Sequence, residues 1–530
     1  MMQFQELPAS HRDIFTLVGR IADELGMDAY VVGGYVRDFY LNRAWGEGAT
    51  DIDFVTVGSG IRLASGVSKA LDDAHLSVFK RFGTAQVRFG GLDLEFVGAR
   101  KESYRRDSRK PLVEDGTLRD DQERRDLTIN AMSWCLNKDR FGVLEDPFEG
   151  LQDLRHRLIR TPVDPHKTFD DDPLRMMRAI RFAAQLEFTI EEETLSAIKE
   201  MAHRIEIISK ERITSELNKI LMSPRPSFGF EKLSETGLLN YFLPEMEALH
   251  GIEERNGVRH KDNFYHTLEV LDNAVRMGGD LWLRWAALLH DIAKPPTKRF
   301  YPDLGWTFHG HEVLGAKWVP KIFRRLALPL DDRMRYVKKL VRLHLRPIAL
   351  VSDDVSDSAI RRLLFDAGDD LEDLMTLCRA DITSKNEWRV KRYRDNFDRL
   401  EVKIATVEEK DRVRNWTNPI GGEEIMRTFG IGPGRKVGEV KNAIKQAIFD
   451  GVIPNEEDAA RAFMMEIKSR DMKPDETQQD TGADAAQAEK QNETQHDKQH
   501  KTKQDTGEDA ASHPMKTINP RQPKPPSDNP

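Results

Sequence analysis

Hydrophobic and polar positions follow two different patterns along the chain, and the change comes near residue 150. Before it, short apolar runs alternate with helix-like segments, in the order YVVGGYVRDFYL, DIDFVTV, VRFG, LDLEFVGA and a helix-like DLTINAMSWCL. This alternation predicts a mixed α/β head over residues 1–150. Residues 101–121 form a long polar stretch, which we interpret as a mobile surface loop between the last of these strands and the next helix.

From residue 151 to residue 472 the pattern is helical. Apolar residues recur at spacings of three and four, strand signals disappear, and Pro and Gly punctuate the helices. We expect a helical neck over 151–245, a second helical domain over 246–400 and a C-terminal helical region over 401–472. Residues 473–530 contain almost no large apolar side chains, so we expect a disordered tail there.

Composition narrows the class of protein. The 530 residues are 39% hydrophobic and 32% charged, and no apolar run approaches the roughly 20 residues of a membrane span. The N-terminus resembles neither a signal sequence nor a transit peptide, so we expect a soluble, cytoplasmic protein without a membrane partner. Cys135 and Cys378, far apart in apolar surroundings, are expected to be buried free thiols. The net charge of -8 still permits phosphate binding through local basic patches.

Two acidic residues in a β-rich run make a candidate metal site. Strand alternation places Asp51 and Asp53 on one face and sends Ile52 into the core. Glu95, on a later strand, is our preferred third ligand, and Asp93 has the same parity and stays an alternative. Three carboxylates suit Mg²⁺, which keeps waters and is shared with substrate phosphates.

A glycine pair follows the strand just before these acids. Gly33 and Gly34 allow backbone amides to approach a phosphate closely, and Arg37 adds positive charge. An ordinary strand-to-helix turn explains a glycine pair alone equally well. The Asp51 and Asp53 pair downstream favours the phosphate-binding interpretation.

Five segments in order now support a family resemblance: GGYVRDFYL, DIDFV, RRDLTINAM, DPFEGLQDL and DDPLRMMRAIRFA. They resemble the successive motifs of class II tRNA nucleotidyltransferases and bacterial poly(A) polymerases. The resemblance implies a polymerase-β-like head in which Asp51 and Asp53 bind Mg²⁺, and two ions would activate a 3′-hydroxyl and stabilise the leaving pyrophosphate. It further implies that Gly34 and Arg37 hold the incoming nucleotide and that Arg125 contacts its phosphates or sugar.

The last of these motifs carries the predicted base-selection residues. We expect a helix that starts with acids in its first turn at Asp171 and Asp172 and bears an arginine at every third position afterwards, at Arg175, Arg178 and Arg181. A solvated basic stripe is the plainer interpretation of such spacing. The resemblance instead implies that Asp172 and Arg175 pair with the base and accept C and A without a template. In the later SKERITSEL segment, we expect Arg212 to tie the neck together rather than to take part in chemistry.

A second candidate metal site lies downstream. His266, the adjacent His290 and Asp291, and Asp381 follow the H…HD…D order of the HD phosphohydrolase superfamily, and this resemblance implies an HD domain over 246–400. His311 and His344 are possible assistants. Imidazole and carboxylate ligands suit Mn, Fe, Ni or Co as well as Mg²⁺. The domain is expected either to hydrolyse phosphoesters at RNA ends or to be a degenerate RNA-binding scaffold.

We therefore expect an enzyme that adds CCA to the 3′ end of tRNA from CTP and ATP. A poly(A) polymerase, an enzyme adding only A or only CC, and an HD phosphohydrolase acting on RNA ends are the alternatives. Residues 432–437, with Arg435, are expected either to hold tRNA phosphates or to be a simple helix–helix connection. The sequence leaves the oligomeric state open.

Overall fold

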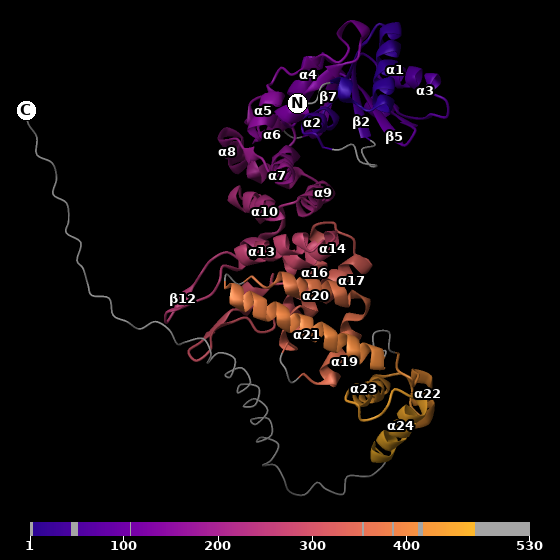
Figure 1. Cartoon of the computed structure of the whole chain (residues 1–530), viewed down its shortest axis with the longest axis vertical. Helices are drawn as coiled ribbons and strands as arrows, with labels where there is room; N and C mark the ends of the chain where they lie inside the picture. Colours follow the sequence, from indigo (N-terminus) through magenta and orange to yellow (C-terminus); the bar gives the residue numbers. More distant parts are fainter. Residues whose placement is uncertain are drawn as a thin grey trace, which may run out of the picture. The chain divides into compact units, whose positions relative to one another are not determined.

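The computed structural model describes residues 4–43, 51–105, 108–351, 355–383, 386–411 and 417–471 (Figure 1). Contacts within the chain divide it into two compact units. The first comprises residues 1–417 together with 449–451, and the second comprises residues 418–448 together with 452–530. The predicted disordered tail over residues 473–530 lies outside the described residues.

A seven-stranded mixed sheet forms the N-terminal head. In spatial order its strands are β3 (His75–Phe79), β4 (Thr84–Phe89), β5 (Leu92–Gly98), β2 (Asp51–Val57), β1 (Asp28–Val32), β8 (Ser133–Cys135) and β9 (Leu144–Glu145). Only the central pair β2 and β5 is parallel within this sheet. Helices α1 (Ala9–Leu25) and α3 (Gly60–Ala70) pack on one face, where the rings of Phe15 and Phe54 lie 5.9 Å apart. The predicted α/β head is confirmed.

The helix expected over DLTINAMSWCL is wrong. Residues 128–130 form a short 3-10 turn, and the chain then enters strand β8, which pairs with β1 so that Trp134 lies opposite Val31. Every residue from 127 to 136 is buried, so the segment has no polar face of the kind that an amphipathic helix needs. Cys135 therefore lies on a buried strand, and both it and Cys378 are free thiols as expected.

The polar stretch after β5 is ordered secondary structure rather than the expected loop. Strands β6 (Arg100–Arg105) and β7 (Ser108–Asp115) pair antiparallel, and helix α4 (Leu118–Glu123) follows. Thr117 and Asp120 form a reciprocal capping box that begins this helix. The two strands satisfy each other's backbone hydrogen-bonding groups by pairing. Their sequence lacks the alternating apolar residues by which a strand is usually recognised, so the pair was not predicted.

A series of short helices forms the neck, as predicted. They are α5 (Gly150–His156), α6 (Pro165–Asp171), α7 (Leu174–Leu186), α8 (Glu192–Met201), α9 (Lys210–Leu221), α10 (Pro226–Glu235), α11 (Leu239–Phe242) and α12 (Pro244–Glu247). Helix α7 packs against both α9 and α10 and is buried over most of its length (Figure 1). The parallel pair β10 (Leu158–Ile159) and β11 (Thr189–Ile190) ties the neck together.

The next part of the chain is a helical domain around the buried helix α14 (Leu281–Leu289). The other helices are α13 (Asn263–Arg276), α15 (Lys294–Thr297), α16 (His311–Arg325), α17 (Asp332–Leu343), α18 (Leu345–Ala349), α19 (Asp357–Ala367), α20 (Leu371–Ala380) and α21 (Glu387–Asp411). Within the described residues, no helix has both the length and the apolar character required to cross a membrane.

Two small hairpins in this domain were not expected. Strands β12 (Glu254–Arg255) and β13 (Val258–Arg259) form one, and β14 (Arg299–Tyr301) and β15 (Gly305–Thr307) form the other. The turn of the first uses positive φ angles at Asn256 and Gly257. Strands of two or three residues are too short to show the alternation of side chains by which strands are recognised in a sequence.

Helix α9 of the neck contacts the helical domain directly. The indole Nε1 of Trp285 on α14 donates to Asn218 Oδ1 at 2.9 Å, and the hydroxyl of Thr214 donates to the carbonyl of Leu326. The guanidinium of Arg284 donates to the carbonyl of Leu221 at 2.7 Å, at the end of α9. One side of this helix is therefore fixed by the domain that follows it.

The second unit holds helices α22 (Gly422–Phe429), α23 (Arg435–Phe449) and α24 (Glu457–Asp471), apart from the last residue of α23. An ion pair of 2.6 Å joins Glu424 to Arg461, so α22 and α24 lie together. Gly430 ends α22 in a left-handed conformation, and residues 431–434 connect it to α23. The stretch 432–437 is thus a helix–helix connection running into α23, and its contact with tRNA stays a prediction.

Candidate active site and candidate metal centre

Strand β2 carries its two aspartates on the face of the sheet away from α1 and α3. Ile52 and Phe54 alternate with them and are fully buried, as predicted. The parallel pairing of β2 with β5 places Glu95 opposite Asp53 and Asp93 opposite Asp51. Four carboxyl groups thus lie in two adjacent rows, on neighbouring strands of one sheet.

Of the two candidates on β5, Asp93 already has cationic and polar partners. Its Oδ1 accepts from Arg88 Nε at 2.9 Å and from Gln86 Nε2 at 3.1 Å. Burial, followed by the charges of Asp53, Asp51 and Asp93, raises the pKa of Glu95. Of these two acids, Glu95 therefore has the greater need of a compensating cation when ionised.

Asp53 has a similar electrostatic environment. Although its side chain reaches solvent, the surrounding protein desolvates the carboxyl and raises its pKa; Arg125 opposes this effect, and the charges of Asp51 and Asp121 add to it. Carboxylate oxygens are the ligands that Mg²⁺ prefers, and a bound cation would offset the repulsion between these neighbouring negative charges. The residues present therefore fit a magnesium site.

The glycine turn borders this row of acids. Gly33 has φ of +75°, which side-chain-bearing residues rarely adopt, and a Cβ built on it would lie 3.0 Å from Arg125 Nη1 and 3.8 Å from Asp53 Oδ2. Gly34 is the first residue of helix α2 (Gly34–Tyr40). The strand, glycine pair and helix predicted for this motif are confirmed in the fold, and Gly33 leaves the space in which Arg125 and Asp53 approach each other.

Arg37 of α2 is buried and engaged by protein groups. Its Nε and Nη2 donate to the two carboxylate oxygens of Asp38 at 2.9 and 2.8 Å, and its Nη1 donates to Asn130 Oδ1 at 2.7 Å. Its guanidinium also lies 4.8 Å from the ring centroid of Phe182 on α7. Arg37 therefore connects the glycine turn to α7, and it is not among the residues lining the pocket described next.

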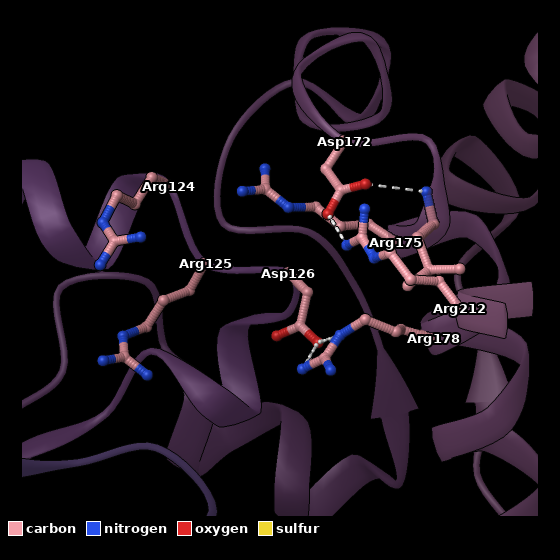
Figure 2. A pocket seen from close by; sticks show the side chains of 8 residues that line it. Arg124, Arg125, Asp126, Asp172, Arg175, Arg178 and Arg212 are labelled. Carbon is pink, nitrogen blue, oxygen red and sulfur yellow. Dashed lines mark hydrogen bonds and ion pairs between the residues drawn. The ribbon is translucent and has the colours of Figure 1, made fainter. Parts of the chain in front are cut away.

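A pocket of about 260 Å³ opens between the head and α7 (Figure 2). Five of its eight lining residues are arginines and two are aspartates, so its walls favour an anionic ligand. They are Arg124, Arg125, Asp126, Asp172, Leu174, Arg175, Arg178 and Arg212. The pocket thus brings together four residues named from the sequence: Arg125, Asp172, Arg175 and Arg178.

Asp172 lies in the connection between α6 and α7 rather than in the first turn of a helix. Helix α6 ends at Asp171, Asp172 is extended with φ of −145° and ψ of 99°, and α7 begins at Leu174. The prediction that Asp171 and Asp172 occupy the first turn of the arginine-bearing helix is therefore wrong. Pro173 accounts for the difference, because a proline disfavours helical geometry at the residue before it.

The carboxylate of Asp172 has two partners on the pocket wall. Arg212 Nη2 donates to one oxygen at 2.7 Å, and the amide of Leu174 donates to the other at 3.2 Å (Figure 2). Arg175 Nη1 donates to the carbonyl of Thr168 at 3.2 Å. Both side chains are held in place by these contacts and keep further hydrogen-bonding capacity.

Arg178 and Arg181 have different partners although they lie on the same helix. Arg178 donates to Asp126 Oδ2 at 2.7 Å on the pocket wall (Figure 2). Burial disfavours ionisation of Asp126, but Arg178 and Asn130 outweigh it and lower the pKa of this carboxyl. Arg181 forms a buried ion pair of 2.6 Å with Glu216 of α9, and it does not line the pocket.

Four pocket residues were not assigned to the site from the sequence: Arg124, Asp126, Leu174 and Arg212. Arg124 and Asp126 are the sequence neighbours of Arg125, so the prediction for Arg125 could have been extended to them. Arg212 does lie in the neck, as expected, but its contact with Asp172 also makes it part of the pocket wall. Only the fold brings α9 beside the connection that carries Asp172.

Six side chains form the candidate metal centre of the helical domain. His266 lies on α13, His290 and Asp291 follow α14, and His311, His344 and Asp381 lie at the ends of α16, α17 and α20. Their ligand atoms form two groups with metal-like spacing: His266, His290 and Asp381, and Asp291, His311 and His344. The structure thus brings together all the residues named from the sequence for this site.

The chemistry of the cluster fits a divalent cation. His290 Nε2 and Asp291 Oδ2 are buried and lie 3.1 Å apart, and Lys294 Nζ lies 2.5 Å from the same Asp291 oxygen. His266 Nε2 lies 2.9 Å from Asp381 Oδ1; burial disfavours its charged form, but Asp291 and Asp381 outweigh this effect and raise its pKa to about 9. Imidazole and carboxylate groups gathered this closely in the interior are a donor set that suits a divalent transition metal.

Comparison with known proteins agrees with this arrangement. Three family models match the chain: the poly A polymerase head domain over residues 29–160, the probable RNA- and SrmB-binding site of polymerase A over 187–249, and the HD domain over 263–386. The sheet of the head, much of the neck and the metal-spaced cluster fall within these three ranges.

Relatives and solved structures point in the same direction. An A-adding tRNA nucleotidyltransferase of Deinococcus radiodurans is 35% identical over 360 residues, which cover 66% of this chain and 79% of the relative. A multifunctional CCA protein of Neisseria gonorrhoeae is 37% identical over 318 residues, which cover 57% of this chain and 70% of the relative. The Bacillus stearothermophilus CCA-adding enzyme in complex with CTP shares the fold, with a TM-score of 0.59, 23% identity, and coverage of 88% of this chain and 99% of that chain.

An α/β head with an acid-bearing strand, joined to a helical neck and an HD domain, defines the class as a nucleotidyltransferase. The chain belongs to the family of tRNA nucleotidyltransferases and poly(A) polymerases, and it contains an HD domain. The resemblance inferred from its five ordered motifs is confirmed.

Proposed function

We propose that the protein adds C, C and A in turn to the 3′ end of tRNA, using CTP and ATP and no nucleic-acid template. The observation that carries this proposal is the position of Arg125. It lines the arginine-rich pocket and also lies beside Gly33 and Asp53, so a nucleotide in the pocket can direct its phosphates towards the acids of β2. Similarity to relatives named as A-adding and multifunctional CCA enzymes supports the same class of substrate.

In this proposal Asp51, Asp53 and Glu95 would hold Mg²⁺. Bound magnesium supplies activation of the 3′-hydroxyl and charge stabilisation of the departing pyrophosphate. The chain itself aligns the reactants: the glycine turn leaves room beside Asp53, and Arg125 offers donors to the phosphates or the sugar. Asp121 holds Arg125 through an ion pair of 3.0 Å, so this guanidinium is already oriented.

Asp172 and Arg175 select the base. The carboxylate has two acceptor contacts occupied, by Arg212 and Leu174, out of about four available, and the Arg175 guanidinium has four more N–H donors besides the one that Thr168 receives. Cytosine and adenine each offer an amino group and a ring nitrogen that these groups can satisfy. Guanine or uracil would leave donors or acceptors unpaired in the pocket, which is costly.

The alternatives differ in product, so one experiment separates them. The full chain is incubated with tRNA ending at the discriminator base, after C, or after CC, and each labelled NTP is supplied separately. We expect C on the first two substrates, A on the third, and little G or U on any. Addition of A alone to the CC-ending substrate would indicate an A-adding enzyme, C alone a CC-adding enzyme, and long A tracts a poly(A) polymerase.

The HD domain supports a second candidate function, a metal-dependent phosphohydrolase acting on RNA ends. The two groups of histidines and aspartates with metal-like spacing favour this function, because a bound divalent cation can activate water for attack on a phosphoester. Its test uses RNA ending in a 2′,3′-cyclic phosphate. Hydrolysis should require an added divalent cation and vanish in the H290A/D291A variant, while nucleotide addition persists. An enzyme acting on tRNA ends is expected to work in the cytoplasm.

A further inference from the structure

The two small hairpins of the HD domain pack together and leave their outer sides exposed. The indole Nε1 of Trp306 on β15 donates to the carbonyl of Val258 on β13 at 3.1 Å, so one hairpin lies against the other. All residues from 251 to 259 are exposed, and in Figure 1 the β12 hairpin projects away from the helices of the domain. None of the hairpin residues lines the arginine-rich pocket, so nucleotide addition leaves this surface without a role.

Aromatic rings and cations lie side by side on the two hairpins. The guanidinium carbon of Arg255 lies 5.0 Å from the ring centroid of Phe300, and the ammonium nitrogen of Lys298 lies 5.3 Å from that of Trp306. Tyr301, on the same strand as Phe300, is 47% exposed. Proteins that bind single-stranded RNA combine the same two kinds of group, because rings stack on bases and cations pair with phosphates.

The hairpins carry more positive than negative charge. Over residues 251–261 and 298–308, the cations Arg255, Arg259, Lys261, Lys298 and Arg299 oppose the acids Glu253, Glu254 and Asp303. Ion pairs within the surface already neutralise the two glutamates, one with Lys298 and the other with Arg259. Within the part of the chain that the structure describes, Arg255 and Arg299 have no ion pair, so both are available to an anionic ligand. The surface therefore suits a chain of phosphates.

The same surface adjoins the histidine and aspartate cluster of the domain. Lys261, just after the first hairpin, donates to Thr383 Oγ1 at 3.3 Å, and that hydroxyl lies 2.9 Å from His266 Nδ1. Phe308 follows the second hairpin, and its carbonyl oxygen lies 2.7 Å from His311 Nδ1. Each hairpin is thus connected to a histidine of the cluster through a short series of contacts. A strand bound on the hairpins would have its end close to these histidines.

We propose that the two hairpins bind the single-stranded 3′ end of an RNA and hold its last nucleotides beside the HD cluster. Tyr301 presents its exposed ring to a base, and Arg255 and Arg299 pair with the phosphates on either side. The rings favour a nucleic acid over an acidic peptide, whose carboxylates would use the cations alone. This inference rests on the second candidate function, and it makes an RNA strand, rather than a free mononucleotide, the preferred substrate of the HD domain.

Photo-crosslinking tests the contact without requiring hydrolysis. The full chain is irradiated with a short single-stranded RNA that carries 4-thiouridine next to a 3′ end closed as a 2′,3′-cyclic phosphate. We expect crosslinks to residues 299–306, identified by mass spectrometry. R255E/R299E should lose most of these crosslinks at an unchanged melting temperature. Crosslinks that fall only in the head, the neck or residues 418–471, or that R255E/R299E leaves unchanged, overturn the proposal.

Kinetics separate this surface from the cluster itself. For Y301A and R255A/R299A, the KM for the same RNA should rise about tenfold, whereas kcat and the KM for a free 2′,3′-cyclic mononucleotide stay within about twofold. K321A/R324A removes two exposed cations of α16 outside the hairpins, and as the matched control it should change neither KM. An equal rise in KM for both substrates would overturn the proposal. If neither substrate is hydrolysed, the candidate hydrolase is refuted, and the crosslinks still decide whether RNA binds here.

Discussion

Asp53 of β2 and Glu95 of β5 lie directly opposite each other, because the two strands run parallel and pair in this register. The neighbouring pair, Asp51 and Asp93, differs because Arg88 already neutralises Asp93. Position along the strand alone therefore does not indicate which of these carboxylates could bind a cation. The protein groups that already contact each carboxylate must be considered as well.

Replacement of the acids that we propose as Mg²⁺ ligands should abolish nucleotide addition selectively. We expect D53A and E95Q to lose CMP and AMP incorporation because Mg²⁺ loses a ligand, whereas tRNA binding measured by gel shift stays close to that of the parent. D93N is the matched control and should reduce incorporation less than about tenfold, equivalent to about 1.4 kcal/mol. Incorporation retained by D53A would refute the metal assignment.

The same acids should make stability depend on pH and magnesium. The pKa values of Asp53 and Glu95 are raised, so their contribution to stability is present below the ordinary carboxyl range and is lost as pH rises through the folded-state pKa values. At neutral pH without metal, D53N should therefore unfold at a higher temperature than the parent. Added Mg²⁺ should raise the melting temperature of the parent more than that of D53N, and an equal response of the two would contradict the electrostatic argument.

Changes at Arg175 should alter which nucleotide is chosen. R175A removes donors to the base but leaves Arg125 and the acids of β2 in place. We expect the ratio of kcat/KM for CTP to that for UTP to fall by roughly tenfold to a hundredfold, as for a lost hydrogen bond of about 1–3 kcal/mol. The maximal rate with CTP should change less. Unchanged discrimination would argue against pairing between protein and base.

Arg181 should behave differently from Arg175 although both lie on α7. Because Arg181 and Glu216 form a buried pair, E216Q leaves an uncompensated buried charge and should destabilise the fold by about 3–5 kcal/mol. Chemical denaturation measures this loss. R181M/E216L removes both charges and should recover most of the stability with nucleotide choice unaltered. A relaxed choice in the double variant would place Arg181 in base selection after all.

Local pattern sufficed where neighbouring residues determine the outcome. The strand, glycine pair and helix from Val31 to Asp38 follow from apolar spacing and glycine geometry, and the alternation around Asp53 follows from the period of a strand. The five motifs and the ordered histidines and aspartates identified the family and the HD domain. Each of these signals is complete within a short stretch of chain.

Long-range contacts account for the rest. Residues 133–135 become a strand because β1 supplies their hydrogen bonds, and no local signal distinguishes that outcome from a buried helix. Arg212 becomes a pocket residue because α9 packs against α7, some forty residues earlier in the chain. At Asp172 two local signals conflicted. Pro173 indicated a break in the helix, whereas the regular spacing of the arginines after it favoured a helix that already included Asp171 and Asp172.

Helix α9 pairs Arg212 with Asp172 and Glu216 with Arg181 of α7, and it also contacts Trp285, Arg284 and Leu326 of the HD domain. A fragment that stops after the neck would leave those polar groups without the residues they bind and would loosen the support behind Asp172. The transferase and the HD domain therefore cannot be separated cleanly by truncation. The role of each part is better tested by single substitutions in the intact chain.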